Sequence, residues 1–162
     1  MSRHAAGPAV DGGSGAPTAG ARVADAMLRD PKVLGPATTI AQARAFFADG
    51  HVHAALIVER GRLLAVVEPL DLVGDLAADG PAVAVGRLRG RVAAPGADLA
   101  AAWDAMALAA RRRLAVVDER GDLLGLLCLK RSGTGFCSED DVRARAEDSQ
   151  RSDDRYTPVR WR

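Results

Sequence analysis

One stretch of this sequence occurs twice. Residues 53–67 align one for one with residues 113–127, at a constant offset of 60 positions. Each copy has an apolar run, a polar Glu-Arg-Gly segment and a second apolar run, and the three polar residues are identical in both copies. Glycine supplies the positive φ that a tight hairpin turn needs. The pattern therefore predicts two equivalent β-hairpins.

The repeat extends upstream of each hairpin. Residues 33–36 correspond to residues 92–95 at an offset of 59, which places one inserted residue before the second hairpin. After each proline comes a capping residue, Thr38 or Thr39 in the first copy and Asp98 in the second, and then an apolar run with helical spacing. A unit of this length that occurs only twice indicates two halves packed on each other rather than a long solenoid.

These patterns predict the order of the elements. The first copy is expected to have a helical turn at 23–27, a strand at 33–34, a helix to about Asp49, strands at 54–58 and 63–67, and a helix at 69–76. The second is expected to have a leading turn at 85–88, a strand at 92–93, a helix after Asp98, and strands at 114–117 and 123–129. The strands are nearly continuous apolar runs, which is typical of sheets buried on both faces.

Composition limits the classes of function. Lys and Arg number 22 and Asp and Glu 21, a net charge of +1 that favours neither nucleic acid nor a membrane surface as partner. Hydrophobic residues make up 48% of the chain but aromatic residues only 4%, so Ala, Val and Leu must build the core. No secretion signal is visible, and two cysteines predict no disulfide framework, so a cytoplasmic location is expected.

The chain divides into five parts. Residues 1–20 are rich in Gly, Ala and Pro and are predicted to be a disordered leader. Residues 21–78 form the first repeat and 79–132 the second. Residues 133–148 are predicted to be a polar loop followed by a helix, and 149–162 a disordered tail.

A strand, capped helix, hairpin and helix in tandem resemble the pair of cystathionine-β-synthase (CBS) domains called a Bateman module. The segments that carry the resemblance are 23–27, 68–71 and 112–125, and it covers about residues 22–131. It implies an α/β (α+β) fold of two pseudo-symmetric βαββα repeats packed sheet to sheet, with disordered tails. It also implies a homodimer that binds an adenosine-containing nucleotide and regulates an unknown protein partner in trans, without enzyme activity. AMP, ADP, ATP and S-adenosylmethionine are the candidate ligands, and no cofactor is required.

The resemblance also implies a ribose-binding acid in the first copy. Asp71 matches that acid, in the segment Glu68-Pro69-Leu70-Asp71, and a carboxylate can accept hydrogen bonds from both ribose hydroxyls. Glu68 replaces the hydroxyl residue that is usual there and is expected to repel phosphate, which favours adenosine or a lightly charged adenylate.

The second copy lacks this acid, because its aligned segment ends in Lys130 and Arg131. Its ribose contact is therefore missing, although the two cations could bind a phosphate. Adenine is expected to lie against Ala54 and Ala55, with backbone hydrogen bonds near Gly35 and Pro36. The alternative is that these residues are small only because the halves pack closely.

Histidines, cysteines and arginines elsewhere in the sequence are candidates for metal, thiol and phosphate sites. His51 and His53 lack further metal ligands nearby, so they are expected to be exposed or to cap a helix, and no metal site is predicted. Cys128 and Cys137 could form a thiol switch, but the sequence favours an unrelated strand cysteine and loop cysteine. The basic clusters, Arg87, Arg89 and Arg91 and residues 111–113, are predicted to be solvated surface, with a phosphate-binding patch as the alternative.

Two further functions are compatible with the sequence. One is a ligand-free scaffold that dimerises through its Ala-rich helices and presents residues 133–148 to a partner. The other is a redox sensor that uses Cys128 and Cys137. No hydrolase elbow, phosphate-binding loop or zinc-protease motif is present, so no enzyme activity is predicted.

Overall fold

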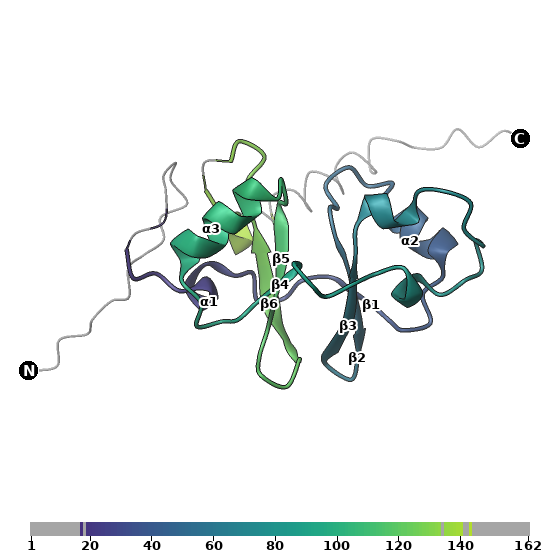
Figure 1. The fold of residues 1–162 in the computed structure, drawn as a ribbon, viewed down its shortest axis with the longest axis horizontal. Coiled ribbons are helices and arrows are strands. Elements are labelled where there is room, and N and C mark those ends of the chain that lie inside the picture. The colour runs from purple at the N-terminus through teal and green to yellow at the C-terminus, as the bar shows by residue number, and fades with distance from the viewer. Residues whose placement is uncertain (1–16, 18, 134, 141–142, 144–162) are drawn as a thin grey trace, which may run out of the picture.

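The computed structural model describes residues 17, 19–133, 135–140 and 143. The chain forms two units whose sheets stand face to face in the middle, with a helix on the outer side of each (Figure 1). The mixed α/β fold of two similar repeats is therefore confirmed. Most of the predicted leader, the predicted tail and most of the predicted C-terminal helix lie outside the described residues.

Each unit contains one three-stranded sheet. The elements of the first unit are β1 (Val33–Leu34), α2 (Ile40–Phe46), β2 (Ala55–Glu59), β3 (Arg62–Val67) and a 3-10 turn, η1 (Pro69–Leu72). Those of the second are β4 (Val92–Ala93), α3 (Leu99–Leu108), β5 (Arg113–Val117) and β6 (Leu123–Cys128). The strand orders are β1-β2-β3 and β4-β5-β6, and in each sheet the first pair is parallel and the second antiparallel.

Local sequence chemistry explains the helix starts. The side chain of Thr39 accepts a hydrogen bond from the N–H of Gln42, and that of Asp98 accepts one from Ala101, so both predicted caps are present. The helix predicted at 69–76 is shorter than expected and ends at Leu72. It stops there because the next residue is extended and Gly74 has a φ of +104°.

The hairpin turns differ in length. In the first hairpin Val58 pairs with Leu63, and the turn residues Arg60 and Gly61 both have positive φ. In the second, Val117 pairs with Leu123, so one more residue lies between the strands. The inserted residue is therefore in the turn, and its predicted place before the hairpin is wrong. Because Glu-Arg-Gly occurs in both copies, the sequence alignment matches the two turns to each other. The positions of the strands are instead determined by their pairing with β1 and β4.

The segments that lead into the two units are exchanged between them. Residues 21–28, with α1 (Val23–Ala26), lie on the second unit, where Leu28 exchanges backbone hydrogen bonds of 2.8 and 2.9 Å with Leu126. Residues 80–87, with the 3-10 turn η2 (Ala82–Ala84), lie on the first unit, where Arg87 exchanges two bonds of 3.1 Å with Val66. The first helical turn thus completes the second copy rather than the first, and the second leading turn lies at 82–84 rather than 85–88.

Three apolar clusters hold the units together. The first-unit core contains Ile40, Ala43, Ala55, Ile57, Ala65, Val67, Leu72 and Ala82. The second-unit core contains Ala21, Val23, Leu99, Ala102, Met106, Leu114, Val116, Leu127, Leu129 and Phe136. Between the sheets lie Leu56, Leu63, Val66 and Ala115. Each sheet is therefore covered by helix on one face and by the other sheet on the opposite face, which explains the continuous apolar strands.

The two cysteines form a disulfide. Cys128 ends β6 and Cys137 returns beside it, with a Cα–Cα distance of 5.3 Å, and both are 2% exposed. Phe136 lies in the second-unit core and packs edge-on against Trp103, with ring centroids 5.4 Å apart. The interpretation of the cysteines as unrelated is therefore wrong. The sequence gap of nine residues had concealed a hairpin return that places them side by side; redox sensing itself stays a prediction.

Candidate functional site

Charged side chains from both units meet where β3 ends. Asp71 lies in η1, and Arg91 directly precedes β4 of the other unit. Two guanidinium nitrogens of Arg91 donate to the two carboxylate oxygens of Asp71, with the Nη2–Oδ1 distance at 3.0 Å. The side chains are only 6% and 5% exposed, respectively. They form a buried, bidentate ion pair across the interface between the units.

Three more side chains complete this group. Arg111 donates from Nε to Oε1 of Glu68 at 2.6 Å, and the Nε of Arg91 lies 3.5 Å from the same oxygen without a hydrogen bond. Arg87 lies at the rim, 66% exposed, with its Nη2 at 3.9 Å from Oδ1 of Asp71. We call Glu68, Asp71, Arg87, Arg91 and Arg111 the Asp71 cluster.

The Asp71 cluster has an excess of positive charge, with three guanidinium groups against two carboxylates. Because Arg111 and Arg91 compensate the charge of Glu68, that residue does not present an isolated negative charge to a phosphate. The expectation that Glu68 would exclude highly charged nucleotides therefore lacks its physical basis. The sequence did not reveal the compensation because Arg111 is far from Glu68 along the chain.

Hydrogen bonding keeps Asp71 ionised. Burial by itself would raise the pKa of its carboxyl, but the hydrogen bonds from Arg91 and from the N–H of Glu68 outweigh burial and lower the pKa below 3.8. The hydrogen bond to Asp71 is likewise the main reason that the pKa of Arg91 is raised.

We expect acid to weaken the fold through Asp71. In the unfolded chain Asp71 takes up a proton near its ordinary pKa of 3.8, whereas in the folded chain it does so only at lower pH. The unfolded state therefore binds more protons between these values, and the free energy of unfolding falls as the pH falls through this window. Urea unfolding between about pH 7 and pH 3 measures the effect. Asp71→Asn should flatten the curve below about pH 4, and an unchanged slope would contradict the assignment.

The structure places the expected adenine contacts in different parts of the first unit. Ala55 is buried in the first-unit core, and Ala54 borders the cluster between the sheets. Gly35 and Pro36 are exposed in the turn after β1, where the carbonyl of Gly35 accepts hydrogen bonds from Thr38. Since β1 runs parallel to β2, this turn lies toward the hairpin end of the sheet, and Asp71 follows the other end.

The second copy gathers basic residues at its corresponding position. Lys130 and Arg131 lie in the loop after β6, where the N–H of Lys130 donates to the carbonyl of Gly135 at 2.8 Å. His53 is half-buried and accepts a hydrogen bond from Arg112 at 3.0 Å. Burial and then the charges of the neighbouring arginines, Arg131 among them, lower the pKa of His53. It is thus neither exposed nor a helix cap.

His51 is exposed, as predicted. Among the described residues, no three metal-ligating side chains come together.

The most important partner of Asp71, Arg91, is not visible in the sequence. Arg91 was assigned to solvated surface but is 5% exposed, and Arg113 is also buried. The alternation of Arg87, Arg89 and Arg91 with uncharged residues does not say which of them meets a carboxylate, because residues 88–91 form a turn in which the N–H of Arg91 donates to the carbonyl of Leu88. Only the packing of the two units decides which one does.

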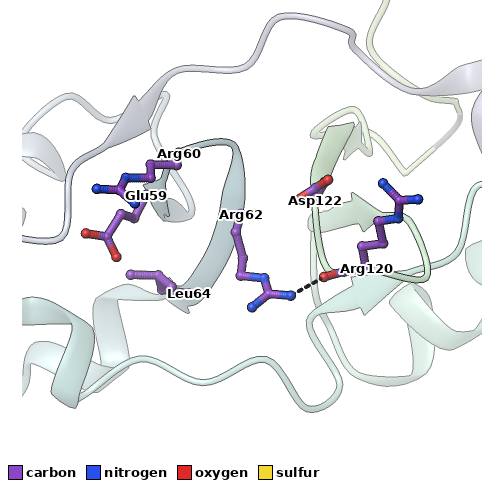
Figure 2. Close-up of a pocket in the computed structure, with 6 residues that line it drawn as sticks. All are labelled: Glu59, Arg60, Arg62, Leu64, Arg120 and Asp122. Atoms are coloured by element: carbon purple, nitrogen blue, oxygen red, sulfur yellow. Dashed lines mark hydrogen bonds between the residues drawn. The ribbon is translucent and has the colours of Figure 1, made fainter.

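A hollow lies at the end of the sheets opposite the Asp71 cluster. It is open to solvent and is lined by Glu59, Arg60, Arg62, Leu64, Arg120 and Asp122. Figure 2 shows Arg62 reaching from the first hairpin to the second, where it donates to the carbonyl of Arg120 at 2.8 Å. The backbones also join here, because Leu63 donates to Gly121 and Leu123 donates to Gly61. These contacts fasten the hairpins together.

Comparison with known proteins identifies the repeat. Residues 23–78 match the model of the CBS domain. The cystathionine beta-synthase pair domain of a Shewanella oneidensis protein has a TM-score of 0.60 and 22% identity, covering 80% of this chain and 74% of that one. Residues 23–78 are therefore similar to a CBS domain, and the chain has the fold of a CBS pair. The predicted resemblance is confirmed, and the two units are arranged as in a CBS pair.

Other solved CBS pairs have the same fold. A CBS domain protein from Pyrobaculum aerophilum, complexed with AMP, has a TM-score of 0.57 and 23% identity, covering 78% of this chain and 99% of that one. A CBS domain pair/ACT domain protein from Thermotoga maritima has a TM-score of 0.54 and 18% identity, with coverages of 80% and 98%. A search of the curated proteins found no match. In the part of this chain that the structure describes, no helix is long and apolar enough to cross a membrane.

Proposed function

We propose that this CBS pair is a regulatory module that binds an adenosine-containing nucleotide at the Asp71 cluster and modulates a protein partner in trans, without catalysing a reaction. The observation that carries the proposal is the pairing of Asp71 with Arg91 and of Glu68 with Arg111, each pair joining one unit to the other. Such a site joins a ribose acceptor to phosphate-binding groups at the interface between the units. A ligand regulates only if it binds two conformations with different affinity.

The chemistry of the cluster suits a nucleotide. The Asp71 carboxylate can accept hydrogen bonds from ribose hydroxyls, and guanidinium groups bind phosphate oxygens in pairs. The complex of the Pyrobaculum aerophilum protein with AMP supports this ligand class. AMP, ADP, ATP and S-adenosylmethionine remain the candidates, and a homodimer remains the proposed assembly.

The remaining assignments are part of the same proposal. Ala54 is proposed to contact adenine, with Pro69 beside the ribose, whereas Ala55 is buried in the first-unit core and Gly35 and Pro36 lie toward the opposite end of the sheet from Asp71. Lys130 and Arg131 are proposed to bind phosphate on the second copy. Their support is the repeat itself, because Arg131 follows β6 as Asp71 follows β3.

Titration calorimetry with the four candidate ligands tests the proposal. At least one should bind at or below millimolar concentration, and Asp71→Asn should weaken it about 10- to 100-fold, because a hydrogen bond to a charged group contributes about 1.5–3 kcal/mol. Asp75→Asn is the matched control, since Asp75 is an exposed acid in the same segment. Absence of binding by all four, or equal weakening by both variants, would remove the proposal.

A second function, the ligand-free scaffold, is favoured by one observation. Asp71 is already bonded to Arg91, so the free protein satisfies its own ribose acceptor. If the scaffold is correct, none of the four nucleotides binds, and deleting residues 140–162 abolishes recovery of the partner. The deletion must begin after Cys137, because that residue and Phe136 are buried in the second unit.

A further inference from the structure

Arg91 already donates hydrogen bonds to the Asp71 carboxylate, which the proposed ligand needs as its ribose acceptor. We infer that Arg91 determines ligand specificity at the Asp71 cluster: it must exchange Asp71 for a phosphate of the ligand, so the site accepts a phosphorylated nucleoside and rejects the unphosphorylated one. The inference rests on the proposed function and names the chemical group that its ligand must carry.

The first step is the acceptor capacity of Asp71. A carboxylate has about four lone-pair positions. Two nitrogens of Arg91 and the N–H of Glu68 use three of them, and Arg87 approaches the remaining side at 3.9 Å. The side chain is 5% exposed. A ribose that brings two hydroxyl donors therefore cannot bind Asp71 while Arg91 stays in place.

The second step is the fate of Arg91 when it leaves. Its side chain is 6% exposed, and a buried guanidinium that loses its carboxylate is strongly disfavoured. Glu68 lies 3.5 Å from Nε but already pairs with Arg111 at 2.6 Å, so without Asp71 one carboxylate would have to compensate two guanidinium groups. A phosphate offers two oxygens with the geometry of a carboxylate. AMP thus supplies Arg91 with a new partner, and adenosine does not.

The third step separates Arg91 from its neighbours. Arg87 is 66% exposed and makes no hydrogen bond to Asp71, so it attracts a phosphate without blocking the carboxylate. Arg111 is held by Glu68 and by the carbonyl of Gly90 at 2.7 Å. Arg91 is the arginine that bonds directly to the carboxylate of Asp71.

Calorimetric affinities for AMP and adenosine test the inference with the wild type, Arg91→Met and Arg87→Met. The wild type should prefer AMP by about 100-fold, the scale expected when a buried charge loses its partner. Arg91→Met should bind adenosine at least about tenfold more tightly than the wild type does, because Asp71 becomes available. Arg87→Met provides the comparison: it should weaken AMP but, unlike Arg91→Met, should not raise the affinity for adenosine.

Each outcome decides the matter. If the wild type binds AMP and adenosine equally, or if Arg91→Met weakens both alike, the inference fails while the proposed function survives. If the wild type binds neither AMP nor adenosine, the inference fails, and the proposed function fails with it only if ADP, ATP and S-adenosylmethionine do not bind either. Thermal unfolding of each variant is recorded first. Should Arg91→Met be unfolded at the assay temperature, Arg91→Lys replaces it; that variant keeps the charge but loses the two-pronged geometry, and it should also bind adenosine more tightly. Unchanged adenosine affinity in Arg91→Lys would overturn the inference.

Discussion

Replacing either member of the Asp71–Arg91 pair should lower the free energy of unfolding by about 3 kcal/mol, whereas replacing both should cost clearly less than the sum. Either single change, Asp71→Ala or Arg91→Met, leaves a charge in the interface between the units, where the partner side chain is 5–6% exposed. The double variant leaves neither charge of the pair. The difference is the coupling energy of two groups that the chain separates by twenty positions.

Urea unfolding of the wild type, both single variants and the double variant at about pH 7.5 provides the cycle. A coupling energy of about 1–3 kcal/mol is expected for residues in direct contact. Arg89→Met is the control for loss of one positive charge, because Arg89 is exposed, and it should change stability by less than about 0.5 kcal/mol. Strict additivity of the two single variants would show that the buried pair does not form.

The second large effect is expected at Gly125, where a leading segment crosses to the other unit. A Cβ at this position would lie 2.5 Å from the carbonyl oxygen of Leu28 and 2.8 Å from the sulfur of Met27. Gly125→Ala must therefore push residues 27–28 off β6 and lengthen the two hydrogen bonds between Leu28 and Leu126. We expect a loss of about 2–3 kcal/mol, the range for overpacking at a backbone contact.

Chemical unfolding measures this loss, and hydrogen exchange locates it. The amides of Leu28 and Leu126 should lose protection in Gly125→Ala, while those of the first hairpin keep theirs. Gly96→Ala is the matched control, because a Cβ there meets nothing within 4 Å, and it should be nearly neutral. If the two variants have the same stability, the leading segment is not packed tightly on β6.

The same contact occurs in the first unit with the two sides reversed. There the glycine is on the leading segment: a Cβ on Gly86 would lie 2.8 Å from the Cβ of Ala65 on β3. In the second unit the glycine is on the strand and Met27 covers it. Wherever a leading segment contacts a strand of the other unit, one of the two contacting residues is therefore a glycine. In one copy the glycine is on the strand, and in the other it is on the leading segment. A sequence alignment of the repeats shows Gly125 opposite Ala65 and gives no reason for either.

The features that the sequence predicted correctly depend on groups close together along the chain. Thr39 and Asp98 bond to amides three residues later, and Gly61 and Gly121 take the positive φ of their own turns. The duplicated apolar runs also predicted strands buried on both faces, because the presence or absence of alternating apolar and polar residues is visible in neighbouring positions of the chain. These features, with the CBS resemblance, were enough for two packed repeats.

The tertiary structure alone decided which distant groups meet. It assigned residues 21–28 to the second unit, moved the inserted residue into the second turn, and joined Cys128 to Cys137. It also buried Arg91 against Asp71, although the sequence presented that arginine as solvated surface. A sequence pattern records that a side chain will be buried or charged, but its partner is chosen by the fit of two sheets folded against each other. The free energy of that choice resides in contacts between residues that are not neighbours in the chain.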